Sequence, residues 1–149
     1  MTAKEYLGKY RKHMSNIVFY EAMKEEAIVN IASLRSPNLD DRVQTSPEND
    51  PIGNLVIQLE RDIAKYNIEI LSCKAKMILI DNQLCSMLEM TEIKKRDVYY
   101  KILSYKYKLG MNWDEIAEKM MTSRSNVTHL HSPALQKFDD LYGETYRYL

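Results

Sequence analysis

Apolar residues recur alternately four and three positions apart along the middle of the chain, from Ile52 to Met87. This spacing is the seam of a heptad repeat, which a helix presents along one side. At ~1.5 Å per residue such a helix is roughly 50 Å long. Because packing stabilises helices more than propensity does, this one has to bury its seam against another helix. The seam consists of Ile52, Val56, Leu59, Ile63, Tyr66, Ile70, Cys73, Met77, Ile80, Leu84 and Met87.

The segment before the seam is the nearest candidate partner. Thr2 and Glu5 have the spacing of a capping box, which predicts a helix that ends before Ser36 and Pro37. Turn residues then predict a loop over 36–50, and Asp50 followed by Pro51 suits the start of the long helix. The apolar stripe expected on the first helix is Leu7, Tyr10, Met14, Ile17, Ile28 and Ile31.

Further apolar residues widen the stripe of the long helix beyond its seam. A wide stripe suits a bundle of three or more helices better than a two-stranded coil. We therefore predict an antiparallel hairpin that also forms a homodimer through the long helix, with a monomeric bundle as the alternative. The additional residues are Leu55, Leu71, Ile78, Leu79 and Leu88.

Composition agrees with an all-α fold. Gly and Pro number only four each, and no alternating run of β-branched residues is present. The formal net charge of zero excludes a strongly basic protein that coats nucleic acid. Cys73 and Cys85 fit neither a metal-binding nor a disulfide spacing, so we expect two small core thiols. No window is apolar enough for a membrane span, which predicts a cytoplasmic protein.

The region after the seam predicts three shorter helices. Thr91 is the expected cap of the first, and Gly110 its end. Asn112 and Glu115 form a second capping-box pattern, and Ser123 is placed to cap the last helix. The inner face expected for the first of these helices is Ile93, Val98, Ile102, Leu103, Tyr105 and Leu109.

Two short helices separated by a tight gap predict a helix-turn-helix. Ala117 is small, which allows the second helix to cross the first at close range. The expected core of the motif is Trp113, Ile116, Ala117, Met120, Val127 and Leu130. The second helix keeps its other face polar, as expected of a face that enters the major groove of DNA.

The polar face carries groups suited to DNA. Arg pairs with guanine or phosphate, and Asn pairs with adenine. Ser or Thr suits a phosphate or either of these bases. The predicted DNA-binding residues are Ser123, Arg124, Ser125, Asn126, Thr128 and His129. Candidate phosphate contacts are Lys94, Lys95 and Arg96. The predicted hairpin and the predicted helix-turn-helix divide the chain into an assembly region, 1–90, and a DNA-binding domain, 91–149.

The stretch "YKYKLGMNWDEIAEKMMTSRSNVTHLHSPALQKF" resembles region four of bacterial sigma factors. It is more similar to the sigma-like late-gene regulators of phages and prophages of Gram-positive bacteria, the ArpU/RinA type. The segments "EYLGKYRK" and "RVQTSPENDPI" extend the resemblance to nearly the whole chain. The resemblance implies promoter DNA as the partner of Arg124 to His129, bacterial RNA polymerase as a further partner, and the host cytoplasm as the location.

Two residues depart from the family pattern. Met121 stands where the turn usually has Gly, so we expect a slightly remodelled turn. Pro133 lies inside the last helix, and we expect a kink or break near Ser132 that weakens the packing of 134–142. The two His of "HLH", His129 and His131, have no third ligand at a metal-binding spacing.

The sequence therefore predicts a sequence-specific DNA-binding transcriptional regulator of phage or prophage genes. Catalytic arrangements and phosphate-binding loops are absent, so neither an enzyme nor a cofactor is expected. One alternative is a phage small terminase subunit, which binds packaging DNA as a ring. The other is a helical module that docks on RNA polymerase and touches no DNA.

Overall fold

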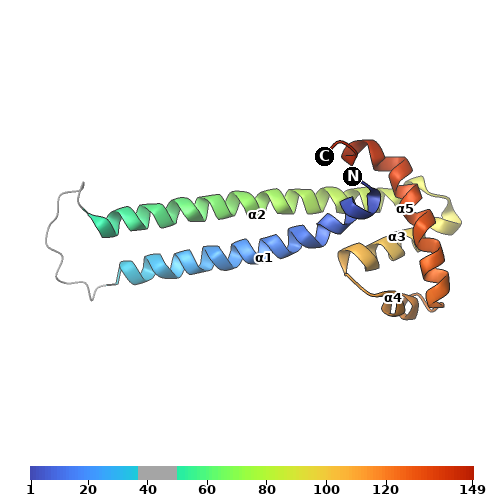
Figure 1. The fold of residues 1–149 in the computed structure, drawn as a ribbon, viewed down its shortest axis with the longest axis horizontal. Coiled ribbons are helices and arrows are strands. Elements are labelled where there is room, and N and C mark those ends of the chain that lie inside the picture. Colours follow the sequence, from blue (N-terminus) through green and yellow to red (C-terminus); the bar gives the residue numbers. More distant parts are fainter. Residues whose placement is uncertain (37–49) are drawn as a thin grey trace. The chain divides into compact units, whose positions relative to one another are not determined.

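The computed structural model describes residues 1–36 and 50–149, and over these residues the fold is all-α with no strand. Two long helices, α1 (Ala3–Leu34) and α2 (Pro51–Met90), precede a shorter helix, α3 (Ile93–Leu103). α3 continues into a π-helical segment, η2 (Ser104–Lys108). The last two helices are α4 (Trp113–Lys119) and α5 (Arg124–Tyr146), as Figure 1 shows. The predicted loop, 36–50, lies almost entirely outside the described residues.

Capping groups start the long helices where the sequence predicts. The Thr2 N–H donates to Glu5 Oε2 at 2.8 Å, and the Glu5 N–H donates to Thr2 Oγ1 at 3.3 Å, which completes the capping box of α1. The Gly53 N–H donates to Asp50 Oδ1 at 2.9 Å, so Asp50 caps α2 with Pro51 at its first position. The prediction that α1 ends before Ser36 is confirmed.

The described part of the chain divides into two compact units. The hairpin unit is 15–74, and the core unit combines 1–14 with 75–149. This division differs from the expected boundary between 90 and 91, because residues 1–14 and the last turns of α2 pack with the C-terminal helices.

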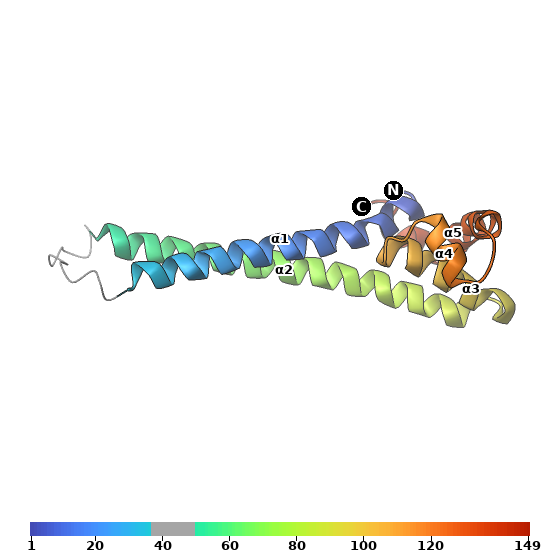
Figure 2. The same cartoon turned by 90° about the horizontal axis from the view of Figure 1, so that it is seen from below.

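In the hairpin unit, the described parts of α1 and α2 run antiparallel and side by side in both Figure 1 and Figure 2. The Tyr20 and Tyr66 rings lie 6.2 Å apart, and Arg35 Nη2 lies 2.9 Å from Glu60 Oε1. The seam residues of α2 in this unit are buried or half-buried. The predicted hairpin is therefore confirmed here, although Ile28 of the α1 stripe is 42% exposed and lies off the packed face.

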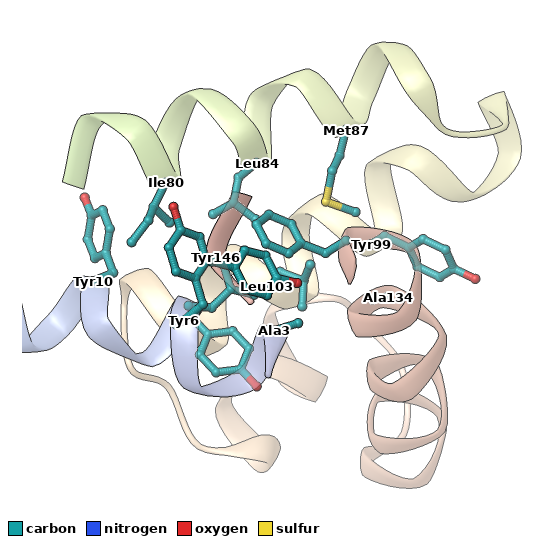
Figure 3. Close-up of a cluster of buried hydrophobic side chains, with 13 residues drawn as sticks. Ala3, Tyr6, Tyr10, Ile80, Leu84, Met87, Tyr99, Leu103, Ala134 and Tyr146 are labelled. Carbon is teal, nitrogen blue, oxygen red and sulfur yellow. The ribbon is translucent and has the colours of Figure 1, made fainter. Parts of the chain in front are cut away.

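In the core unit, one cluster joins α1, α2, α3 and α5. The Tyr6 and Tyr146 rings stack at 4.4 Å, and the Tyr6 hydroxyl donates to Gln83 Oε1 at 2.9 Å. Met14 of the expected α1 stripe is exposed instead. The buried members, most of them labelled in Figure 3, are Ala3, Tyr6, Leu7, Tyr10, Ile80, Leu84, Met87, Tyr99, Leu103, Tyr107, Ala134, Phe138 and Tyr146.

The predictions for Thr91, Cys85 and Leu109 in this unit are also wrong. Thr91 does not cap α3, because the N-cap residue is Glu92 and Thr91 is buried one position before it. Cys85 is exposed, whereas Cys73 of the hairpin unit is buried as expected. Leu109 is 61% exposed, since the wider π-helical turn changes the phase of the helix and brings Tyr107 to the inner face in its place.

Candidate nucleic-acid interface

The first helix of the predicted motif begins at a complete capping box. The Glu115 N–H donates to Asn112 Oδ1 at 2.9 Å, and the Asn112 N–H donates to Glu115 Oε2 at 2.8 Å. These two bonds satisfy backbone groups that a helix start leaves unpaired. The capping box therefore fixes the start of α4 after Asn112, and the predicted start of this helix is confirmed.

The turn between α4 and α5 has the hydrogen bonds of a Schellman motif. The Thr122 N–H donates to the Ala117 carbonyl at 3.0 Å, and the Met121 N–H donates to the Glu118 carbonyl at 3.2 Å. Met121 takes the left-handed conformation, with φ of 54°. The expected remodelling is thus wrong, because Met adopts the backbone geometry that usually belongs to Gly.

A small apolar core holds the two helices together. Ile116 and Val127 are fully buried, and Ala117 is only 6% exposed. Figure 1 shows α4 lying across the first turns of α5, an approach that the small Ala117 side chain permits. Together with Ile102 of α3, these residues form one buried cluster, and the other three predicted core positions, Trp113, Met120 and Leu130, pack against it.

The second helix starts at Ser123, whose hydroxyl oxygen accepts the Asn126 N–H at 3.2 Å. α5 then continues through Pro133 to Tyr146, so of the predicted kink or break near Ser132 the break is wrong. The packing beyond it is also secure, since Ala134 and Phe138 are fully buried.

All six predicted DNA-binding side chains are exposed at the start of α5; they are Ser123, Arg124, Ser125, Asn126, Thr128 and His129. Several already have partners. Arg124 Nη1 lies 3.3 Å from Asp114 Oδ2, and Asn126 Nδ2 donates to Thr122 Oγ1 at 2.9 Å. The Thr128 hydroxyl donates to the Arg124 and Ser125 carbonyls at 3.1 and 3.0 Å.

The predicted phosphate contacts lie elsewhere on the core unit. Lys94 and Lys95 are exposed in the first turn of α3, and the side chain of Arg96 lies outside the described residues. Lys95 lines a cavity of about 270 Å³ together with Pro133, Gln136 and others. Gln136 is ten residues after Asn126, or ~15 Å along the helix. Lys95 therefore lies beside the middle of α5, away from the predicted DNA-binding residues at its start.

Charge around this face is mixed. Asp114, Glu115 and Glu118 are all exposed on α4. Sequence reasoning also missed Lys106, whose Nζ lies 4.3 Å from the Trp113 ring centroid. Its position follows from the π-helical segment, which the sequence did not predict.

His131 does not belong to the polar face. Its Nε2 lies 2.9 Å from the Tyr107 hydroxyl, and its ring lies 4.7 Å from that of Trp113. Burial, with Lys106 and Lys4 nearby, lowers the pKa of His131, and burial raises the pKa of Tyr107 to about 12. The contact is therefore a hydrogen bond between a neutral phenol and an imidazole whose neutral form is favoured, and the tautomer of His131 sets which group donates. Over the described part of the chain, no three His, Cys, Asp or Glu side chains gather as metal ligands would.

Comparisons with known proteins do not identify the chain: it matches no family model, no curated protein and no solved structure. The resemblance to sigma-like regulators therefore stays a prediction. Among the described helices, none is long and apolar enough to cross a membrane.

Proposed function

We propose that this chain is a sequence-specific DNA-binding transcriptional regulator of phage or prophage genes, which reads promoter DNA through α4 and α5. The observation that carries the proposal is the exposed polar start of α5 above the buried contact of Ile116 and Val127. A helix presented in this way fits the major groove, where the first residues of the second helix meet base edges.

The side chains at the start of α5 differ in what they can offer to DNA. Arg124 suits guanine O6 and N7 or a phosphate, and Asn126 suits adenine N6 and N7. Each has to exchange a present partner, Asp114 or Thr122, for the DNA. Because the Thr128 hydroxyl already donates to the backbone, its methyl group remains for contact with a thymine methyl.

Affinity for DNA should be modest for one copy. Acidic side chains of α4 lie beside the few basic ones, and phosphate neutralisation dominates the affinity of DNA-binding proteins. Two linked copies would bind more tightly, because the second contact becomes effectively intramolecular. Bacterial RNA polymerase is a further candidate partner, since it would supply additional contacts at a promoter.

Selection from a random duplex library, followed by gel shift, tests the proposal. The purified chain should enrich a defined sequence and retain it more strongly than a scrambled duplex of equal composition. Arg124→Ala and Asn126→Ala should reduce that preference, whereas Gln136→Ala, on an exposed later turn of α5, should not. Equal retention of the selected and scrambled duplexes by the wild type contradicts the proposal.

The acidic surface of α4 favours a second candidate function, docking on RNA polymerase without DNA contact. Asp114, Glu115 and Glu118 would suit a basic surface on a protein better than phosphates. Pull-down of purified polymerase separates the two functions. If Arg124→Ala abolishes binding to DNA but still binds polymerase, the DNA-reading function is supported. If the wild type binds polymerase but no DNA, the docking function is supported.

A further inference from the structure

α2 carries a second apolar stripe in the hairpin unit, on the side away from its seam. Ile57, Ile68 and Leu71 are 48%, 65% and 66% exposed, and Ala64 is exposed between them. These positions follow the same four-and-three spacing as the seam, with Arg61 filling the remaining place. At ~100° per residue, the centre of this outer stripe lies roughly 150° around the helix from the seam.

The hairpin itself does not use the outer stripe. The seam residues Val56 and Ile70 are buried, which shows that the opposite side of α2 is the one packed inside the unit. An exposed apolar stripe with a heptad spacing is the pattern of a helix-pairing surface. Its sequence also specifies which helix would fit it.

We propose that the outer stripe pairs with the same stripe of a second copy, with the two α2 helices antiparallel. The pairing is centred where residue 66 of one copy lies level with residue 66 of the other. Ala64 then meets Ile68 of the second copy, so a small side chain faces a large one. Arg61 meets Leu71 of the second copy, and its aliphatic stem can lie along that side chain.

Charge complementarity supports this register. Glu60 of each copy lies level with Ser72 of the other and ~3 Å along the helix axis from Lys74, within reach of these long side chains, so two opposite-charge pairs flank the interface. Lys74 has no ion pair among the described residues, and Glu60 presently contacts Arg35 at 2.9 Å on the exposed surface. Moving the helices by one heptad in either direction removes both Glu60–Lys74 pairs.

A parallel arrangement is less favourable. In register, it places Arg61 of one copy against Arg61 of the other within the apolar stripe, where like charges are costly. The antiparallel arrangement has one smaller cost, because Lys65 faces itself near the centre. That side chain is 72% exposed and lies 3.9 Å from Asp62, so solvent and a neighbouring carboxylate weaken the repulsion.

Sedimentation equilibrium of the full chain tests the surface. We expect a wild-type dimer that Leu71→Glu dissociates with a rise in dissociation constant of a hundredfold or more, on the order of the loss of a buried anchor. Leu55→Glu is the matched control, because Leu55 is an exposed apolar residue of the same helix outside the outer stripe. A monomeric wild type, a larger ring, or equal effects of the two variants would overturn the proposal.

Charge exchange tests the register. Lys74→Glu and Glu60→Lys should each weaken the dimer about tenfold, since each replaces two attractive pairs by two repulsive ones. Combining both changes restores the pairs and should recover most of that loss. Circular dichroism controls for the Arg35 contact that Glu60→Lys also removes. A double variant no tighter than either single one excludes the antiparallel register. This proposal depends on the hairpin unit alone, so it stands or fails independently of DNA binding.

Discussion

Asp114 competes with DNA for Arg124, and its removal is the sharpest test of the interface. Arg124 Nη1 lies 3.3 Å from Asp114 Oδ2 and 3.5 Å from Oδ1. Both side chains are well exposed, at 61% and 71%. If Arg124 contacts DNA, this ion pair has to open first, and its free energy is subtracted from the free energy of binding. Asp114→Asn should therefore strengthen binding to the selected duplex.

The exposure of the pair limits how large the gain can be. Exposed ion pairs contribute about 0.2–1 kcal/mol, which corresponds to a gain in affinity of about 1.4- to 5-fold. Removal of a negative charge from the face adds a further gain at low salt, where screening is weak. Salt screens both effects, so fluorescence anisotropy across a salt series has to compare Asp114→Asn with a control that makes the same change in charge elsewhere on α4.

Glu118→Gln serves as the control for Asp114→Asn. It makes the same change in net charge at an exposed position of α4, but no contact between Glu118 and Arg124 exists among the described residues. Asp114 also lies in the first turn of α4, where its charge favours the helix by about 0.3–1 kcal/mol. Urea unfolding should therefore accompany the assay. A variant Asp114→Asn that binds no more tightly than Glu118→Gln, even at low salt where ion pairs are least screened, refutes the role assigned to Arg124.

Two further predictions concern stability. Met121→Gly should stabilise the core unit by about 0.5–1 kcal/mol in urea unfolding, because Met121 has φ of 54° and its side chain is 94% exposed. Met121→Ala is the control and should not stabilise the unit. Equal effects of the two variants on the free energy of unfolding would exclude backbone strain at the turn. His131 and His13 both have pKa values lowered chiefly by burial, so the unfolded chain binds more protons and stability should fall as pH drops below the ordinary value of 6.5. His131→Gln should flatten this loss between pH 7.5 and 5.5, leaving the part due to His13. An unchanged slope would show that folding does not lower the pKa of His131.

The helix-turn-helix could be predicted from the sequence because its signals are local. Asn112 and Ser123 cap helices within three residues of their partners, and Ile116, Ala117 and Val127 follow helical spacing. The heptad seam was predictable for the same reason, since its period is regular over the whole length of α2. Each of these patterns depends on residues a few positions apart, where backbone geometry leaves few choices.

What could not be predicted depends on contacts between distant segments. The packing of Tyr6 on Tyr146 joins the two ends of the chain, and nothing in either local pattern indicates it. The π-helical segment inserts an extra residue into a turn, which shifts Tyr107 inward and Leu109 outward. Cys85 follows a seam residue by one position and is exposed for that reason, although its residue type favours burial.

The continuity of α5 through Pro133 shows how the proposed reading face is held in place. An interior proline costs about 3 kcal/mol in a straight helix, which led to the expectation of a break. Full burial of one large apolar side chain contributes about 1.5–3 kcal/mol, and both Phe138 and Tyr146 are fully buried beyond the proline. Packing therefore outweighs the local penalty. Because α5 is one helix, the core that anchors Tyr146 also orients Asn126 more than four turns away. The exposed start of α5 is thus positioned by residues 1–14 as well as by α4, so changes in that distant segment should alter how the face meets a partner.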